Sequence, residues 1–169
     1  WSGGGYHGHR STRDTGKQDL NANKYHTMNE IFSVKDKVVV ITGGTGVLGS
    51  CISSYLAAEG AKVAILGRRQ SEGDRLVAEI TSKGGEAIFV ATDVMDEQSV
   101  QCACDNILAR FSRVDALLNA AGGNMPGATI APDGNIFDLK VEDFQKVLDL
   151  NLTGTVIPTR IFLRPMVEA

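Results

Sequence analysis

Three glycines, Gly44, Gly46 and Gly49, follow a β-branched run at residues 38–41 with G-x-G-x-x-G spacing. The run is typical of a strand buried on both faces of a parallel sheet. Glycine at these positions permits a tight turn and a close approach of backbone to phosphate. Because the N–H groups that open a helix attract anions, the pattern predicts a nucleotide pyrophosphate site. The alternative is a tight strand-to-helix connection without a ligand, since the motif alone is common.

Short apolar runs alternate with helical periods from Met28 onward, as in α/β proteins. The expected strands cover residues 37–42, 62–66, 87–91 and 114–119. Right-handed crossovers between them make the sheet parallel. The sequence therefore predicts a Rossmann-type, doubly wound parallel sheet with helices on both faces.

The expected helices differ in how clearly the sequence marks them. The first ends at Gly60, and its predicted apolar face is Leu48, Ile52, Tyr55 and Leu56. A second covers residues 71–83, and Asp96 is the predicted cap of a third. The last begins near Val141, and we expect interruptions near Gly154 and Pro158. Between strand and helix, residues 120–140 form a long Gly-, Pro-, Asn- and Asp-rich loop, and its part from Gly123 to Lys140 is expected to lie near the substrate.

The composition is that of an ordinary globular domain, with 169 residues, 43% hydrophobic and 22% charged. A net charge of −3 argues against a general affinity for nucleic acid. No apolar run approaches the ~20 residues that a membrane helix needs, and no signal-peptide pattern is present. We expect a cytoplasmic protein with a small-molecule partner and no membrane partner.

Residues 1–27 differ from the rest of the chain, since they contain all three histidines and no hydrophobic period. We predict a disordered, appended leader over 1–27 and a domain over 28–169. His7 and His9 are the candidate metal ligands of this leader, and we predict no metal site there. Cys102 and Cys104 stand two apart in a helical pattern and so point in different directions, which argues against a metal pair.

Four landmarks at the expected separations make the chain from about Lys35 onward resemble the short-chain dehydrogenase/reductases. They are Thr42-Gly43 with Gly49 after the first strand, Asp93-Val94 after the third, Asn-Ala-Ala-Gly at 119–122 after the fourth, and Asn151 in the last helix. The stretches 119–124 and 149–154 are most similar to the D-mannonate (fructuronate) oxidoreductase branch. Val47 departs from the family pattern, which has glycine there.

The resemblance implies an NAD(P)-dependent oxidoreductase that transfers a hydride between nicotinamide and an alcohol or carbonyl, with a sugar acid such as mannonate or fructuronate as a candidate substrate. It also implies that the full-length protein is a homo-oligomer, a tetramer or dimer. The cofactor-binding residues that it implies are Gly43, Thr45, Gly46, Val47, Leu48, Arg68, Arg69, Asp93, Val94, Asn119, Ala120, Ala121 and Gly122. Of these, residues 45–48 would offer backbone N–H groups, and Thr45 also its hydroxyl, to the pyrophosphate. Asn151 is the one member of the family's catalytic tetrad that the chain contains.

The second strand ends in Gly67-Arg68-Arg69, where a cofactor without a 2′-phosphate usually meets an acidic residue. Two guanidinium groups instead favour NADP over NAD, and one charge-assisted contact to phosphate contributes roughly 1.5–3 kcal/mol. The alternatives are NAD as cofactor and two solvated arginines. Asp93 and Asn151 also have structural alternatives, as a helix cap and as a partner for backbone groups at a kink.

The tetrad's serine and Tyr-x-x-x-Lys are missing, because Tyr6, Tyr25 and Tyr55 are followed four residues later by Arg10, Asn29 and Glu59. In such a pair the lysine lowers the pKa of the tyrosine, which then acts as general acid or base. We therefore expect a fold truncated after the fourth strand and the following helix, with that strand at a sheet edge, and an inactive 169-residue chain. The alternatives are a non-catalytic nucleotide-binding module and, more weakly, a methyltransferase or epimerase.

Overall fold

The computed structural model describes residues 32–169, and the compact unit within it is Val34–Ala169. The leader predicted over residues 1–27 lies outside the described residues. In the part of the chain that the structure describes, no helix has the length and apolar character needed to cross a membrane.

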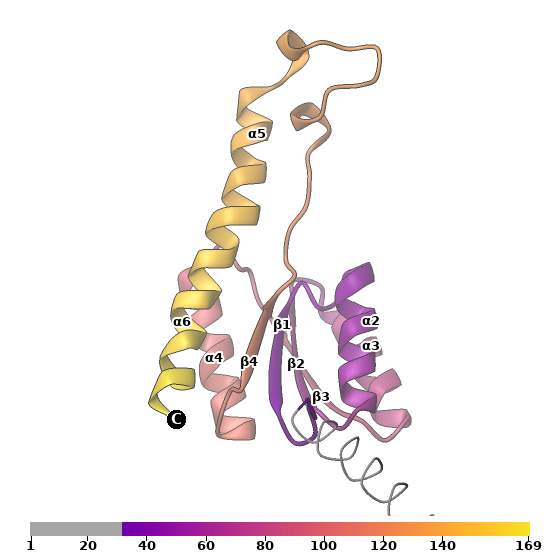
Figure 1. The fold of residues 1–169 in the computed structure, drawn as a ribbon, viewed down its shortest axis with the longest axis vertical. Coiled ribbons are helices and arrows are strands. Elements are labelled where there is room, and N and C mark those ends of the chain that lie inside the picture. Colours follow the sequence, from indigo (N-terminus) through magenta and orange to yellow (C-terminus); the bar gives the residue numbers. More distant parts are fainter. Residues whose placement is uncertain (1–31) are drawn as a thin grey trace, which may run out of the picture. The chain divides into compact units, whose positions relative to one another are not determined.

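Four parallel strands form one sheet in the order β3-β2-β1-β4 (Figure 1). The strands are β1 (Val38–Thr42), β2 (Lys62–Gly67), β3 (Glu86–Ala91) and β4 (Ala116–Asn119). Val40 marks the register, since it lies between Ala64 of β2 and Leu117 of β4. The parallel sheet predicted from the apolar runs is confirmed, and β4 lies at an edge of it as expected.

Helices cover both faces of the sheet, as predicted (Figure 1). On one face lie α2 (Val47–Ala58) and α3 (Gln70–Ser82), and on the other α4 (Glu97–Phe111) and α6 (Gly154–Glu168). The pleat of β1 divides its side chains between them, because successive residues of a strand point to opposite faces. Val38 and Val40 join the core under α4 and α6, whereas Val39 and Ile41 join the core under α2 and α3.

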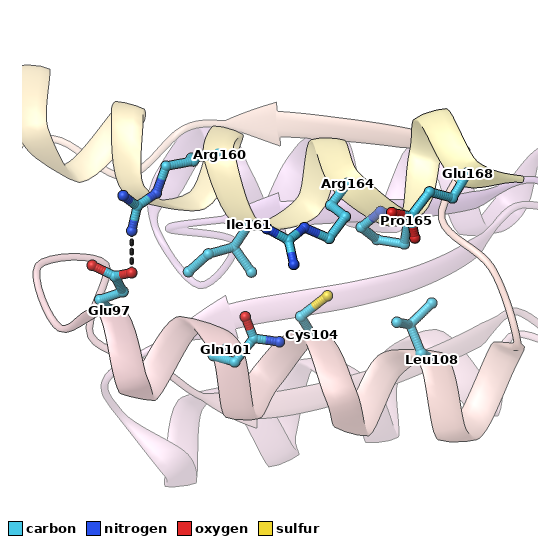
Figure 2. A pocket seen from close by; sticks show the side chains of 9 residues that line it. All are labelled: Glu97, Gln101, Cys104, Leu108, Arg160, Ile161, Arg164, Pro165 and Glu168. Atoms are coloured by element: carbon cyan, nitrogen blue, oxygen red, sulfur yellow. Dashed lines mark hydrogen bonds and ion pairs between the residues drawn. The ribbon is translucent and has the colours of Figure 1, made fainter.

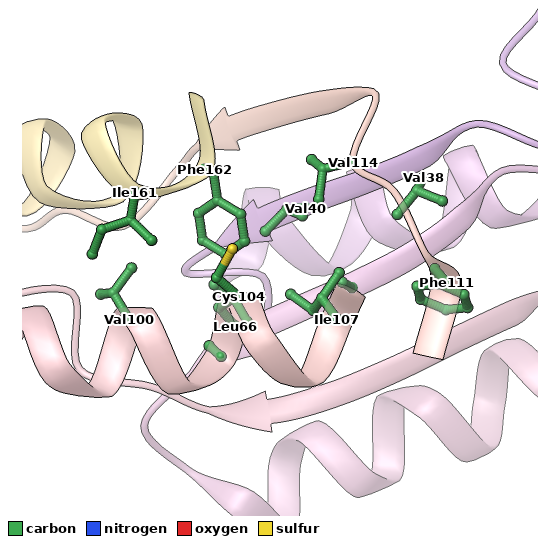
Figure 3. Packing of buried hydrophobic residues seen from close by; sticks show 12 residues of the cluster. Val38, Val40, Leu66, Val100, Cys104, Ile107, Phe111, Val114, Ile161 and Phe162 are labelled. Atoms are coloured by element: carbon green, nitrogen blue, oxygen red, sulfur yellow. The ribbon is translucent and has the colours of Figure 1, made fainter. Parts of the chain in front are cut away.

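The core under α4 and α6 is built around Phe162, which is fully buried. Figure 3 shows Ile161 and Phe162 of α6 facing Val100 and Cys104 of α4. Phe162 thereby fixes the end of α6 against the sheet. The start of the same helix adjoins the carboxyl ends of the strands.

The buried face of α2 differs from the predicted one. Leu48 and Tyr55 are 75% and 66% exposed, whereas Gly49, Ser53 and Ala57 are buried. The prediction was wrong for Leu48 and Tyr55, although Ile52 and Leu56 do pack against the core. The physical reason is distance: α2 approaches the preceding loop so closely that only small residues fit between them.

The final helical region is interrupted earlier than predicted. Its first helix, α5 (Val141–Leu148), leads into a π-helical segment, Asp149–Thr153, and α6 then continues through Pro158 without a break. The N–H of Gly154 donates to the carbonyl of Asp149, five residues earlier, which widens the helix by one residue. The predicted interruption at Pro158 was therefore wrong, and the one near Gly154 lies in the π-helical segment that ends just before it.

The first strand is anchored at its start by Asp115, whose carboxylate accepts a hydrogen bond from the N–H of Val38 at 2.9 Å. Arg113 donates to the other carboxylate oxygen, and Lys37 Nζ lies 3.7 Å from it. Burial would raise the pKa of Asp115, but the hydrogen bonds and the two cations outweigh it and hold the pKa below its usual value.

We expect Asp115→Asn to lower the free energy of unfolding by about 1–3 kcal/mol near neutral pH, since the charge-assisted bonds are lost. A depressed pKa gives stability that is present above the unfolded-state pKa and is lost as pH falls through the folded-state pKa. The free energies of unfolding of Asp115→Asn and of the original chain, measured in urea, should therefore converge as the pH falls from about 5 toward about 2. Asp105→Asn, at an exposed site on α4, is the control and should change stability by less than about 0.5 kcal/mol. A pH-independent difference between Asp115→Asn and the original chain would contradict the account.

The three cysteines differ sharply in access. Cys51 and Cys102 are exposed, whereas Cys104 is buried and burial raises its pKa to about 11. We expect a thiol-alkylating reagent near pH 7.5 to add two labels per folded chain and a third only on unfolding, because the thiolate is the reactive form. Mass spectrometry of the intact chain measures the count. Rapid labelling of Cys104 in the folded chain would show that the α4–α6 core opens.

Candidate nucleotide-binding site

A cavity of about 390 Å³ lies at the carboxyl ends of the strands. Open α/β sheets bind their ligands at this edge. The lining residues come from the loops after all four strands and from the π-helical segment. They are Gly43, Thr45, Gly46, Gly67, Arg68, Arg69, Thr92, Asp93, Val94, Met95, Ala120, Ala121, Gly122 and Leu150.

The loops after β1 and β4 are held in contact by Thr42. Its buried hydroxyl accepts hydrogen bonds from the N–H groups of Ala120 and Ala121, each at 3.1 Å. Gly43 follows with φ of +62°, and a Cβ there would lie 2.7 Å from the carbonyl oxygen of Ala120. Both the backbone conformation and the contact therefore require glycine at this position.

The glycine-rich loop ends at the N-terminus of α2. A Cβ on Gly49 would lie 2.4 Å from the carbonyl oxygen of Gly43, so glycine allows the helix to begin directly against the loop. The N-cap of α2 is Gly46, so no side chain accepts a hydrogen bond from the first N–H groups of the helix, and the first turn contains no acidic residue. The first N–H groups of a helix have no acceptor within it, and they favour an anion.

Val47 and Leu48 do not line the cavity with their side chains, which are exposed. Their backbone N–H groups belong to the first turn of α2. The sequence predicted a contribution from their backbone only. That role does not require glycine at position 47, so the departure from the family pattern leaves the donors in place.

Arg68 and Arg69 lie together at the end of β2 and differ in their partners. Arg69 Nη2 is 2.7 Å from Glu72 Oε2, within the first turn of α3. Arg68 has no hydrogen bond or ion pair with any of residues 32–169. A Cβ on Gly67 would lie 3.0 Å from the hydroxyl of Thr45, so this part of the cavity has little room for an acidic side chain.

The loop after β3 presents Asp93 and Val94 to the cavity. One carboxylate oxygen of Asp93 accepts the N–H of Met95 at 3.0 Å, while the capping of α4 falls to Asp96, as predicted. Val94 is almost fully buried, and a Cβ on Gly154 would lie 3.0 Å from it. The start of α6 therefore supports the apolar side of this loop.

Residues at the end of β4 and in the loop after it face two different sides of the sheet edge. Ala120, Ala121 and Gly122 line the cavity, but Asn119 does not. The side-chain N–H of Asn119 donates to Thr159 of α6 at 2.9 Å, on the face opposite α2 and α3. Asn119 thus links β4 to α6.

Asn151 lies in the π-helical segment and holds the loop after β4 through one amide group. Its carbonyl oxygen accepts the N–H of Gly123 at 3.2 Å, and its NH₂ donates to the carbonyl of Gly123 at 2.7 Å and to that of Val147 at 2.8 Å. A Cβ on Gly122 would lie 2.5 Å from the Asn151 amide oxygen. The π-helical turn therefore clamps residues 122–123 beside the cavity.

Four lining residues are absent from the set that the sequence predicted: Gly67, Thr92, Met95 and Leu150. Gly67 directly precedes the predicted Arg68. Thr92 and Met95 flank Asp93 and Val94, so the ends of that loop were the signal that could have found them. Leu150 precedes Asn151, but it reaches the cavity from the π-helical segment, which no pattern in the sequence indicates.

A second cavity, of about 470 Å³, lies in the groove between α4 and α6 (Figure 2). Glu97 and Arg160 form an ion pair across it, and Cys104, Leu108 and Ile161 line its apolar part. Among residues 32–169 no group of three or more His, Cys, Asp or Glu side chains is arranged to hold a metal ion. The cavity at the strand ends is the candidate site, because open α/β sheets bind their ligands at this edge.

The residues at the strand ends fit a dinucleotide. A glycine loop and an uncapped helix N-terminus offer N–H groups to phosphate. Arg68 and Arg69 line the cavity, and Val94, Met95 and Leu150 provide apolar surface. Such a mixture of apolar walls and a few directed polar groups is typical of cofactor sites.

Comparison with known proteins agrees with this geometry. A family model described as short chain dehydrogenase matches residues 37–169. An uncharacterized oxidoreductase of Bacillus subtilis is 41% identical over 141 residues, which cover 79% of this chain and 51% of that protein. Cyclopentanol dehydrogenase of Comamonas sp. is 36% identical, over 80% of this chain and 52% of that protein. The chain spans about half the length of the curated relatives it matches.

Two solved structures with bound cofactor are similar to this chain. One is a Haemophilus influenzae protein assigned as a D-mannonate oxidoreductase, with bound NAD, at a TM-score of 0.73 and 30% identity; the match covers 82% of this chain and 53% of that one. The other is NAD⁺-bound xylitol dehydrogenase, at a TM-score of 0.72 and 30% identity, with 80% and 50% covered.

Proposed function

Because the chain belongs to the short-chain dehydrogenase family, we propose that the cavity at its strand ends binds a nicotinamide dinucleotide for an NAD(P)-dependent oxidoreductase. When bound, the cofactor would donate a hydride to a carbonyl in its reduced form, or accept one from an alcohol in its oxidised form. The observation that carries the proposal is the bonding of Thr42, just before the glycine loop, to Ala120 and Ala121, beside the uncapped N-terminus of α2.

Each lining loop has a role in this proposal. The N–H groups of residues 45–48 and the Thr45 hydroxyl bind the pyrophosphate, and Gly43 shapes their turn. Asp93 accepts from the adenine amino group through its carboxylate, and Val94 packs on the ring. Residues 119–122 border the ribose, with Asn119 acting through its bond to Thr159. The proposed catalytic residue is Asn151, and its bonds to Gly123, which hold the loop after β4 beside the cavity, support this role.

The proposed cofactor is NADP. Arg68, just after β2, has no hydrogen-bond or ion-pair partner among residues 32–169, and position 67 is a glycine, so no carboxylate there repels a 2′-phosphate. NAD is the alternative, supported by its presence in the D-mannonate oxidoreductase and xylitol dehydrogenase structures.

The proposed substrate is a small polyhydroxylated carbonyl or alcohol, such as a sugar acid of the mannonate or fructuronate type. Support comes from the names of similar proteins, which include D-mannonate oxidoreductase, xylitol dehydrogenase and D-threitol dehydrogenase. We place the protein in the cytoplasm as a homo-oligomer, a dimer or tetramer, with α6 contributing the contact through exposed apolar residues such as Val156 and Leu163.

A non-catalytic nucleotide-binding module is the second candidate. It is favoured by Tyr55, which is exposed on α2 and is followed four residues later by Glu59 instead of lysine. Titration of the 169-residue chain with NADPH, followed by the fluorescence of the reduced nicotinamide, tests binding, and absorbance at 340 nm in the presence of fructuronate tests turnover. We expect saturable binding without oxidation. Absence of binding would refute both candidates, whereas oxidation would refute the proposed inactivity of this chain.

A further inference from the structure

We infer that Glu72 sets the strength of the preference for NADP by holding Arg69 away from the 2′-phosphate. The inference rests on the proposed function, since it requires a nucleotide in the cavity at the strand ends. It concerns two arginines that are adjacent in sequence and line the same cavity, yet differ in their partners.

The carboxylate of Glu72 and the guanidinium of Arg69 form an i,i+3 pair at 2.7 Å across the start of α3. Arg69 is the N-cap of that helix, and Glu72 is the acidic residue of its first turn. A carboxylate in the first turn of a helix is favoured by the helix dipole. Glu72 is therefore a stable partner for Arg69.

The position of Glu72 relative to the cavity is defined by Thr45. Thr45 lines the cavity at the strand ends and also a recess of about 120 Å³ between α2 and α3. Glu72, Arg75 and Glu79 line that recess, and none of them lines the cavity at the strand ends. Arg69 thus has its guanidinium directed to a carboxylate outside the cavity, while Arg68 keeps no partner among residues 32–169.

The two arginines consequently have different relations to a 2′-phosphate. Arg68 can form a charge-assisted hydrogen bond without breaking another contact. Arg69 must first break its ion pair with Glu72, and this cost offsets part of the binding free energy gained from the 2′-phosphate. Glu72 is thus a positioning residue that acts through Arg69, and it keeps the chain's discrimination between NADPH and NADH below what two unengaged arginines would give.

Calorimetric titration of the 169-residue chain with NADPH and with NADH tests the inference. In Glu72→Gln the ratio Kd(NADH)/Kd(NADPH) should rise about three- to fivefold, corresponding to the loss of an exposed ion pair. Kd for NADH should stay the same, whereas a general loosening of α3 would weaken both cofactors. In an Arg69→Gln background, Glu72→Gln should change nothing, because Arg69 mediates the effect.

Glu79→Gln is the matched control, since Glu79 lines the same recess but pairs with Lys83 at 2.7 Å. An unchanged ratio in Glu72→Gln, an equal rise in Glu79→Gln, or a rise that persists without Arg69 would each overturn the inference. Arg68→Gln distinguishes its failure from that of the proposed function. If Arg68→Gln lowers the ratio while Glu72→Gln leaves it unchanged, only the role of Glu72 is refuted. If neither variant changes it, the proposed NADP site is refuted as well.

Discussion

Gly49→Ala should raise the Kd for NADPH by about a hundredfold or more and lower the free energy of unfolding by about 1–3 kcal/mol. The added Cβ would stand 2.4 Å from the carbonyl oxygen of Gly43 and 2.7 Å from Cα of Gly44, so the loop or the helix must move. Either movement displaces the N–H groups that bind phosphate. Loss of one or two charge-assisted bonds, at roughly 1.5–3 kcal/mol each, accounts for the expected change in affinity.

Gly84→Ala is the control for the glycine substitution itself. Gly84 has φ of +86°, and a Cβ there would meet nothing within 4 Å, so alanine adds backbone strain without a collision. We expect it to lower stability by about 1 kcal/mol and to leave the Kd for NADPH unchanged. Calorimetric titration gives the affinities, and urea unfolding gives the stabilities. Normal NADPH affinity in a folded Gly49→Ala chain would contradict the assigned role of the loop.

Arg68→Gln should weaken NADPH binding by about ten- to a hundredfold and leave NADH binding within about twofold of the original value. The reason is that Arg68 is the guanidinium of the cavity that has no competing partner among the described residues. Only a cofactor with a 2′-phosphate gains from it.

Arg75→Gln removes the same charge from α3 at a residue that lines the neighbouring recess instead of the cavity. It should change the affinity for NADPH by less than about threefold, because exposed charges at a distance are screened by salt. Fluorescence titration of NADPH and NADH at matched ionic strength compares the two variants. Equal effects of Arg68→Gln and Arg75→Gln would show that net charge, and no specific contact, governs the preference.

The features that local sequence determines were predicted well. Each strand is a short apolar run, and the cap of α4 is an aspartate just before a helical period. Both features are predictable because each is determined by a few consecutive residues. The alternation of side chains along a strand also predicts where Asn119 points, because residues two apart in a strand share a face. Leu117 packs against the core under α4 and α6, and Asn119 bonds to α6 on the same face. The i,i+3 spacing of Arg69 and Glu72 was likewise available as a signal for their pairing.

The features that depend on distant segments could not be predicted in the same way. The buried face of α2 is set by its close approach to Gly43, and apolarity alone favoured Leu48 and Tyr55, which the structure exposes. The π-helical turn is likewise supported by Asn151, which bonds to Gly123, 28 residues away. Such contacts arise only when the loops after the strands are assembled at one edge of the sheet.

The most direct test of the central claim is to locate bound NADPH by the amide chemical shifts of the isotope-labelled 169-residue chain. The account predicts that the largest shifts on titration fall at residues 43–48, 67–69, 93–94 and 120–122, around the cavity at the strand ends. Shifts confined to the groove between α4 and α6, or no shifts at saturating NADPH, would contradict it.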